Sequence, residues 1–86
     1  MITVYSKAGC PNCVKAKTLL EFYEIEYEEV RIDEDNFGLA FIKGKGHKSV
    51  PQLYVGETLL VEGGFQGLNK MTTKQLAIRI REINGN

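Results

Sequence analysis

The sequence has little of what marks several specialised protein classes. Of its 86 residues, none is tryptophan, two are proline and two are cysteine, and eleven basic residues balance eleven acidic ones. This balance argues against a strongly basic nucleic-acid binder. No apolar run approaches the ~20 residues of a membrane span. The first residues also lack the basic and apolar segments of a secretory signal, so we expect a cytoplasmic protein.

The length and composition predict one domain, spanning residues 1–86. Hydrophobic residues make up 43% of the chain, which is enough for a single small core. A secreted miniprotein held together by disulfides usually carries more than two cysteines. The two that are present, Cys10 and Cys13, are three positions apart, so a bond between them closes almost no loop. We therefore expect the pair to serve chemistry rather than stability.

The spacing of apolar residues predicts an α/β fold. Alternating and β-branched residues predict strands over 1–6, 27–32, 52–55 and 58–61. Helical spacing predicts helices over 11–23, over 36–43 and from a capping box at Thr72 and Gln75 to about residue 84. A helix between the first two strands implies that they pair in parallel. The resulting order is β-α-β-α-β-β-α, a four-stranded mixed sheet covered by helices.

The cysteine pair falls where the first strand gives way to the first helix. If Cys10 is the N-cap, Pro11 takes the first helical position, where its missing N–H costs nothing. The N–H groups of Asn12 and Cys13 then point toward the Cys10 sulfur, at the positive end of the helix dipole. Lys7 adds a nearby positive charge. Such a setting lowers the pKa of a cysteine thiol, so we expect Cys10 to be the reactive thiolate and Cys13 the deeper thiol.

Two other interpretations of the pair remain open at this point. Two cysteines at this spacing are also half of a zinc site, but zinc takes four ligands and the chain offers only His47 as a further soft ligand. The cysteines could also be unreactive core residues. A cysteine pair at a strand-to-helix junction of a βαβ unit favours redox chemistry over both. We expect no metal, and we interpret His47 as a solvated loop residue.

In two further segments, the sequence indicates backbone that could contact a ligand. Pro51 stands at the start of the third strand, and a cis bond before it would leave the backbone of Val50 facing a ligand. An extended peptide could pair with that backbone in a strand-like way. Gly63 and Gly64 allow the chain to approach a ligand closely. The alternatives are a trans bond before Pro51 and a simple loop at Gly63 and Gly64.

Taken together, these motifs resemble those of the glutaredoxins over nearly the full length of the chain. The resemblance rests on three stretches in this order: Tyr5-Ser6-Lys7 before Cys10-Pro11-Asn12-Cys13, then Ser49-Val50-Pro51-Gln52-Leu53-Tyr54-Val55, then Gly63-Gly64-Phe65. It implies a thioredoxin-like fold with a cis proline at position 51. It also implies glutathione as a co-substrate, with no tightly bound cofactor.

The resemblance also implies roles for single residues. Cys10 would be the nucleophile and Cys13 the resolving thiol. The implied glutathione-binding residues are Lys7, Asn12, Ser49, Val50, Pro51, Gly64, Phe65 and Gln66. The sequence departs from the family pattern at three of these: Asn12 replaces a common tyrosine, Ser49 a usual threonine, and the neutral Gln66 stands where an aspartate often pairs with the glutathione amine.

The expected function is glutathione-dependent reduction of protein disulfides and of glutathione mixed disulfides by dithiol exchange. The expected partners are glutathione and disulfide-containing or glutathionylated proteins, with ribonucleotide reductase as a client known in the family, and the expected state is a monomer. One alternative is a redoxin recharged by thioredoxin reductase, which the neutral Gln66 favours. Another is an iron–sulfur cluster carrier, which Pro11 and the second cysteine disfavour.

Overall fold

The computed structural model describes residues 1–85 and contains the predicted four-stranded mixed sheet. The strands are β1 (Ile2–Ser6), β2 (Tyr27–Arg31), β3 (Gln52–Val55) and β4 (Thr58–Leu59). Their order in the sheet is β2-β1-β3-β4. β1 pairs in parallel with β2, as the intervening helix implied, and antiparallel with β3, which forms the predicted hairpin with β4.

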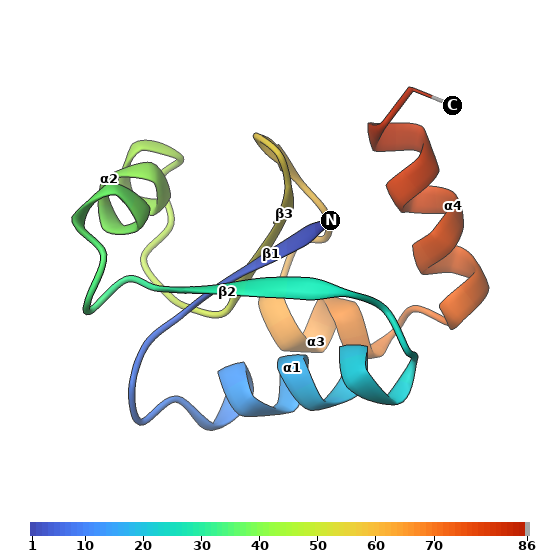
Figure 1. Cartoon of the computed structure of the whole chain (residues 1–86), viewed down its shortest axis with the longest axis horizontal. Helices are drawn as coiled ribbons and strands as arrows, with labels where there is room; N and C mark the ends of the chain where they lie inside the picture. The colour runs from blue at the N-terminus through green and yellow to red at the C-terminus, as the bar shows by residue number, and fades with distance from the viewer. Residues whose placement is uncertain (86) are drawn as a thin grey trace.

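Four helices surround this sheet. They are α1 (Pro11–Phe22), α2 (Asn36–Gly44), α3 (Gly64–Asn69) and α4 (Thr73–Ile83). Figure 1 shows α1 and α3 side by side along one side of the sheet, with α2 and α4 at separate places around it. Within residues 1–85, no helix combines the length and the apolar character needed to cross a membrane.

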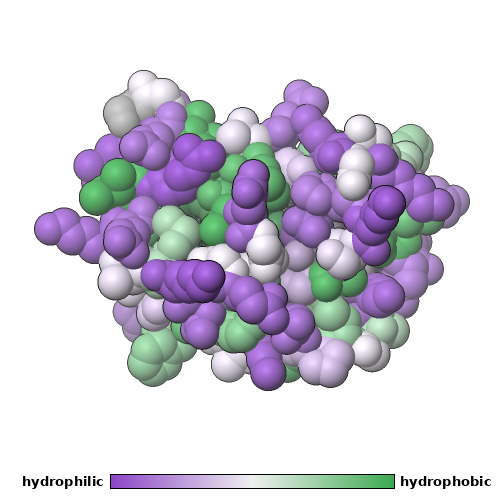
Figure 2. Space-filling view, turned by 180° about the vertical axis from the view of Figure 1, so that it is seen from behind, coloured by the Kyte–Doolittle hydropathy of each residue, from purple (hydrophilic) through white to green (hydrophobic). Residues whose placement is uncertain are grey.

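The main core lies on the face of the sheet toward α1, α3 and α4. Side chains of a strand alternate between faces, so Ile2 and Val4 of β1 point to this face and Tyr5 to the other. The buried cluster is formed by Ile2, Val4, Ala16, Leu20, Leu53, Val55, Leu60, Leu68 and Leu76. Seen from behind, the molecule presents mostly hydrophilic side chains, with hydrophobic ones in small separate areas (Figure 2).

Aromatic rings join the opposite face of the sheet to α2. Tyr5 stacks on Phe41 with ring centroids 5.3 Å apart, and Tyr54 meets both rings edge-on. Asp35 caps α2 by accepting hydrogen bonds from the N–H groups of Phe37 and Gly38. A Cβ at Gly38 would lie 2.5 Å from a methyl group of Val30. Gly38 is therefore what lets α2 approach β2 closely.

The structure adds one element that the sequence prediction lacked. Residues 64–69 were expected to be a break or loop before the last helix, and they form the short helix α3. Two glycines give this segment a low helix propensity, but Leu68 is fully buried in the core and fixes the helix there. The capping box of Thr72 and Gln75 then starts α4, as predicted, while β4 ends two residues earlier than expected.

Candidate functional site

The cysteine pair occupies the predicted junction between β1 and α1, and of the two N–H groups expected to reach the Cys10 sulfur, that of Cys13 donates to it. Cys10 is the N-cap of α1, Pro11 is at its first turn, and the N–H of Cys13 donates to the Cys10 sulfur at 3.2 Å. The two sulfurs form a disulfide, and the Cα atoms are 5.2 Å apart. Cys13 is only 1% exposed, whereas Cys10 is half-buried. The geometry therefore gives the two sulfurs unequal access to a substrate.

In the reduced protein, we expect the pKa of the Cys10 thiol to lie below its ordinary value. The thiolate accepts the hydrogen bond of the Cys13 N–H and sits at the positive end of α1, and both interactions favour the charged form. Thiolate absorbance of a Cys13→Ser variant, followed against pH, measures this pKa directly. A midpoint at or above the ordinary value of about 8.5 would show that the helix end does not stabilise the thiolate.

Val50 and Pro51 lie directly beside the cysteine sulfur. The Val50–Pro51 peptide bond is cis, as the sequence and the family resemblance indicated. The carbonyl oxygen of Val50 is 3.8 Å from the Cys10 sulfur. Val50 lies two residues before β3 begins, so its backbone stands outside the strand ladder. Its backbone is therefore placed for a substrate that reaches Cys10.

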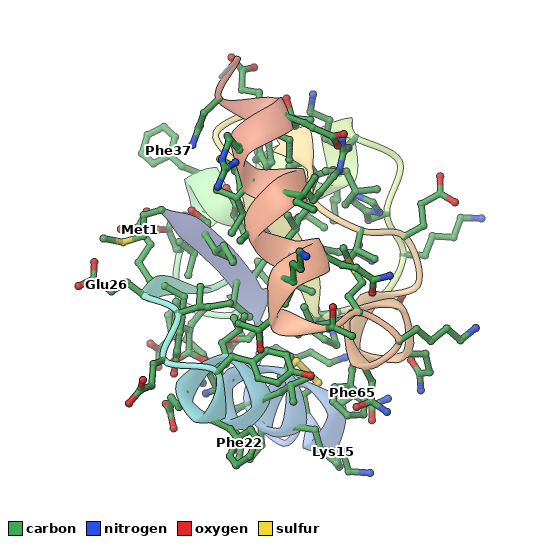
Figure 3. The ribbon with its side chains drawn as sticks, turned by 90° about the vertical axis from the view of Figure 1, so that its right-hand side faces the viewer. Met1, Lys15, Phe22, Glu26, Phe37 and Phe65 are labelled. Carbon is green, nitrogen blue, oxygen red and sulfur yellow. A yellow bond between two sulfur atoms is a disulfide. The ribbon has the colours of Figure 1, made fainter. Side chains whose placement is uncertain are left out.

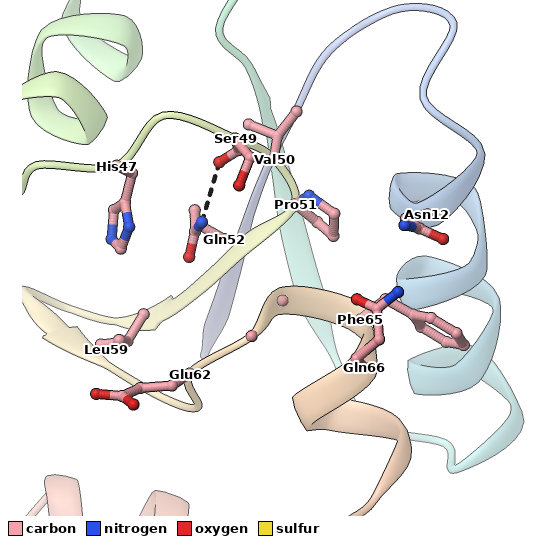
Figure 4. A pocket seen from close by; sticks show the side chains of 12 residues that line it. Asn12, His47, Ser49, Val50, Pro51, Gln52, Leu59, Glu62, Phe65 and Gln66 are labelled. Carbon is pink, nitrogen blue, oxygen red and sulfur yellow. Dashed lines mark hydrogen bonds between the residues drawn. The ribbon is translucent and has the colours of Figure 1, made fainter.

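A groove of about 470 Å³ opens next to this backbone (Figure 4). It brings together seven of the eight residues predicted to bind glutathione: Asn12, Ser49, Val50, Pro51, Gly64, Phe65 and Gln66. Gly64 has a φ of +57°, and a Cβ there would lie 2.7 Å from the carbonyl oxygen of Pro51. This glycine lets the start of α3 pack against the proline and close one side of the groove.

The eighth residue, Lys7, lies elsewhere. It lines a smaller hollow of about 150 Å³ on the other side of Val50, together with Lys43 and Lys48. Ser49, Val50 and His47 border both spaces. The surface around Val50 thus has a hollow with three lysines on one side and the groove on the other.

His47 is not the solvated loop residue that the sequence suggested. Its side chain is half-buried, and its Nε2 lies 2.5 Å from the hydroxyl oxygen of Tyr54, which is itself only 2% exposed. The rings also meet edge-on. The sequence prediction was wrong because nothing local indicates that residue 47 packs against a strand seven positions later. This contact joins the loop before Val50 to β3.

The groove also contains residues that no sequence motif marks, above all Glu62. Its carboxylate lines the groove next to Leu59, away from the end occupied by Asn12 and Gln66 (Figure 4). The only sequence signal was its position directly before Gly63 and Gly64. The neutral Gln66 is therefore not the whole electrostatic environment of the groove, because an acidic group stands four residues before it.

Two polar clusters hold the end of β1 and the loop that leads to Cys10. Asp33 accepts two hydrogen bonds from Arg31, which lower its pKa to about 2, and one from the N–H of Ala8. The fully buried Ser6 donates to Glu29, which also pairs with Lys17 of α1 at 2.8 Å. The hydrogen bonds of Lys17 and Ser6 lower the pKa of Glu29. Both clusters attach this end of β1 to neighbouring segments.

Among residues 1–85, no three side chains of histidine, cysteine, aspartate or glutamate form a group that could hold a metal ion. In particular, the only other ligand that the sequence offered for a zinc site with the cysteines, His47, contacts Tyr54 instead.

The sheet order, the cis proline and the cysteine pair at a helix start define a redoxin of the thioredoxin-like fold. The chain superposes on the crystal structure of a buckwheat glutaredoxin–glutathione complex with a TM-score of 0.73, covering 96% of this chain and 78% of that one at 23% identity. At that identity the likeness shows the fold.

The sequence comparisons are more specific. Residues 2–60 match the glutaredoxin family model. A glutaredoxin of Neisseria meningitidis serogroup A is 35% identical over 72 residues, which cover 81% of this chain and 82% of that protein. Glutaredoxin 1 of Rickettsia typhi is 42% identical over 59 residues, covering 63% of this chain but 55% of the relative, so the chain spans about half of that protein's length. This chain belongs to the glutaredoxin family.

Proposed function

We propose that the protein is a glutathione-dependent thiol–disulfide oxidoreductase that reduces protein disulfides and glutathione mixed disulfides. The observation that carries this proposal is the position of the Cys10 sulfur. It lies at a helix N-terminus, 3.8 Å from the Val50 carbonyl oxygen, beside a groove that brings together seven of the residues that the family resemblance implied for glutathione. Membership of the glutaredoxin family supports the same chemistry.

The charges around the groove suit glutathione, which carries two carboxylates and one ammonium group. We infer that its cysteinyl backbone pairs with Val50, which places the sulfur next to Cys10. The glycine carboxylate then faces the hollow of Lys7, Lys43 and Lys48. The γ-glutamyl end lies along Gly64 and Gln66 in the groove. Exposed charges of this kind contribute modestly to affinity and more to orientation.

The chemistry follows from the unequal positions of the two sulfurs. With a glutathionylated protein, the Cys10 thiolate attacks the glutathione sulfur, forms a Cys10–glutathione disulfide and releases the protein thiolate. A second glutathione then attacks the glutathione sulfur of that bond. This step restores the Cys10 thiolate and releases glutathione disulfide. With a protein disulfide, Cys10 first bonds to the client, and Cys13 displaces it to give the Cys10–Cys13 disulfide. Two glutathione molecules then supply the two electrons that reduce this bond.

A comparison of electron donors tests the proposal. The substrate is the mixed disulfide of glutathione and 2-mercaptoethanol, and the oxidised donor is recycled at the expense of NADPH. We expect turnover with glutathione and glutathione reductase, and none with thioredoxin reductase alone. Turnover with thioredoxin reductase and none with glutathione would overturn the proposal in favour of a redoxin recharged by that enzyme.

The groove also predicts how charge at residue 66 affects glutathione binding. Gln66→Asp places a carboxylate on α3 where the γ-glutamyl amine is expected, and an exposed pair of this kind is worth about 0.2–1 kcal/mol. We expect the KM for glutathione to fall up to a few-fold at low salt, with kcat unchanged because the amine is remote from the sulfur. The effect should shrink at high salt.

Asn69→Asp is the matched control, because it adds the same charge to α3 at an exposed position that does not line the groove. Glu62→Gln removes the one acidic side chain of the groove at the end away from Gln66, so it should change the KM for glutathione less than Gln66→Asp does. If Gln66→Asp and Asn69→Asp have equal effects at low salt, residue 66 does not face the amine and the placement of glutathione is wrong.

A further inference from the structure

An apolar hollow lies outside the groove, along the exposed side of α1. It has a volume of about 340 Å³ and is lined by Val14, Lys15, Thr18, Leu19, Phe22 and Phe65, and we name this set the α1 face. Val14 is 56% exposed and Phe22 is 79% exposed. Figure 3 shows Lys15 and Phe22 on the outer side of α1, with Phe65 next to Lys15. Large apolar side chains gathered at one exposed place indicate a binding surface.

The α1 face is continuous with the redox site. Val14 stands one helical turn beyond Cys10, since its N–H donates to the Cys10 carbonyl oxygen at 3.2 Å. Val14, Thr18 and Phe22 follow at intervals of four residues, so they share one side of the helix. Phe65 lines both the groove and the α1 face. A chain bonded to Cys10 can therefore extend over this surface without leaving the protein.

The charge of the surface indicates the chemistry of what binds there. Lys15 is the only charged side chain among the six, and its ammonium nitrogen lies 5.9 Å from the centre of the Phe65 ring. The next lysine along the helix, Lys17, is already paired with Glu29. A ligand of the α1 face therefore meets apolar side chains and one positive charge, which favours apolar and acidic groups.

We propose that the α1 face docks protein substrates through a segment that carries apolar and acidic side chains next to the reactive cysteine. This inference rests on the proposed function and adds a substrate preference to it. Glutathione at Val50 occupies the groove and the lysine hollow, whereas a protein bonded to Cys10 also covers the first turns of α1. The part of the α1 face outside the groove thus affects protein substrates and leaves small disulfides unaffected.

Synthetic peptides serve as the probes. Each peptide is closed into a ring by one internal disulfide and followed by a tail. The acidic peptide has a tail of leucine, phenylalanine and aspartate, and the basic peptide has the same tail with lysine in place of each aspartate. The mixed disulfide of glutathione and 2-mercaptoethanol is the small substrate. We expect the wild-type protein to show a lower KM for the acidic peptide than for the basic one.

Three variants separate docking from chemistry. Phe22→Ser should raise the KM for the acidic peptide up to roughly tenfold, with kcat and the KM for the small substrate unchanged. Phe37→Ser is the matched control, because Phe37 is 90% exposed on α2, away from the α1 face, and should change nothing (Figure 3). Lys15→Glu should reverse the preference and make the basic peptide the better substrate.

The results distinguish failure of the docking proposal from failure of the proposed function. Equal KM values for the two peptides in the wild type, or equal effects of Phe22→Ser and Phe37→Ser, would overturn the docking proposal while turnover of the small substrate sustains the proposed function. A dimer in sedimentation that Phe22→Ser dissociates would also overturn it, by showing that a second copy covers the face.

If the wild type reduces nothing, the proposed function fails. Docking is then judged by the fluorescence anisotropy of a labelled acidic peptide in which serines replace the cysteines. Weaker binding to Phe22→Ser than to Phe37→Ser would support the docking surface, and equal binding would overturn it.

Discussion

Replacement of Cys10 by serine is expected to abolish disulfide exchange, whereas replacement of Cys13 should abolish only part of it. Cys10 is the half-buried sulfur that faces Val50 and accepts the N–H of Cys13, so no other sulfur can begin the reaction. Cys10→Ser should therefore reduce every substrate at the uncatalysed rate. Cys13 is 1% exposed, so we expect it to react only when it displaces a client protein from Cys10.

The Cys13→Ser variant tests this division of roles. It should retain most of its activity on the mixed disulfide of glutathione and 2-mercaptoethanol, because Cys10 alone takes the glutathione. On a protein disulfide it should stall as a covalent complex between Cys10 and the client, visible as a band that reducing agent removes. Equal losses in the two variants on the small substrate would show that the sulfurs do not have separate roles.

The second large effect is expected at Gly67, whose role is not visible in the sequence. It lies in α3 against the segment before Gly63: a Cβ at this position would overlap the carbonyl oxygen of Glu62 and lie 2.9 Å from a methyl group of Val61. Gly67→Ala therefore requires the backbone to move, and overpacking of this kind costs about 1–3 kcal/mol. At about 4–8 °C per kcal/mol for a domain of this size, Tm should fall by roughly 4–24 °C.

Gly44→Ala is the matched control for this prediction. Gly44 is also helical, has no positive φ, and has no atom within 4 Å of the place where a Cβ would stand. Thermal unfolding followed by circular dichroism should show a Tm equal to or above that of the wild type. If Gly67→Ala melts at the same temperature as Gly44→Ala, α3 does not pack tightly enough to shape the groove.

The sequence predicted those parts of the site that depend on local rules. Cys10 and Pro11 carry the signature of a helix start, so the geometry of the cysteine pair followed from N-cap chemistry. The alternation in β1 placed its buried residues, and Thr72 with Gln75 placed the start of α4. The cis bond before Pro51 needed the family resemblance as well, because the residues alone left both isomers open.

The parts that could not be predicted depend on contacts between distant residues. The helix α3 forms because Leu68 is buried against the core, which overrides the low helix propensity of its two glycines. His47 packs on Tyr54, and Glu62 lines the groove, because the β3–β4 hairpin folds back beside the loop before Val50. Lys7 is close to Cys10 in sequence but lines the smaller hollow. Val50 lies between this hollow and the groove.

The most direct test of the account is the position of glutathione itself. Reduced Cys13→Ser protein treated with glutathione disulfide should carry one glutathione on Cys10, and isotope-edited nuclear Overhauser spectra of this adduct locate the tripeptide. We predict contacts from its cysteinyl residue to Val50 and from its γ-glutamyl residue to Gly64 and Gln66. An adduct whose glutathione contacts Val14 and Phe22 on α1, with none to Val50 or Gly64, would contradict the assignment of the groove.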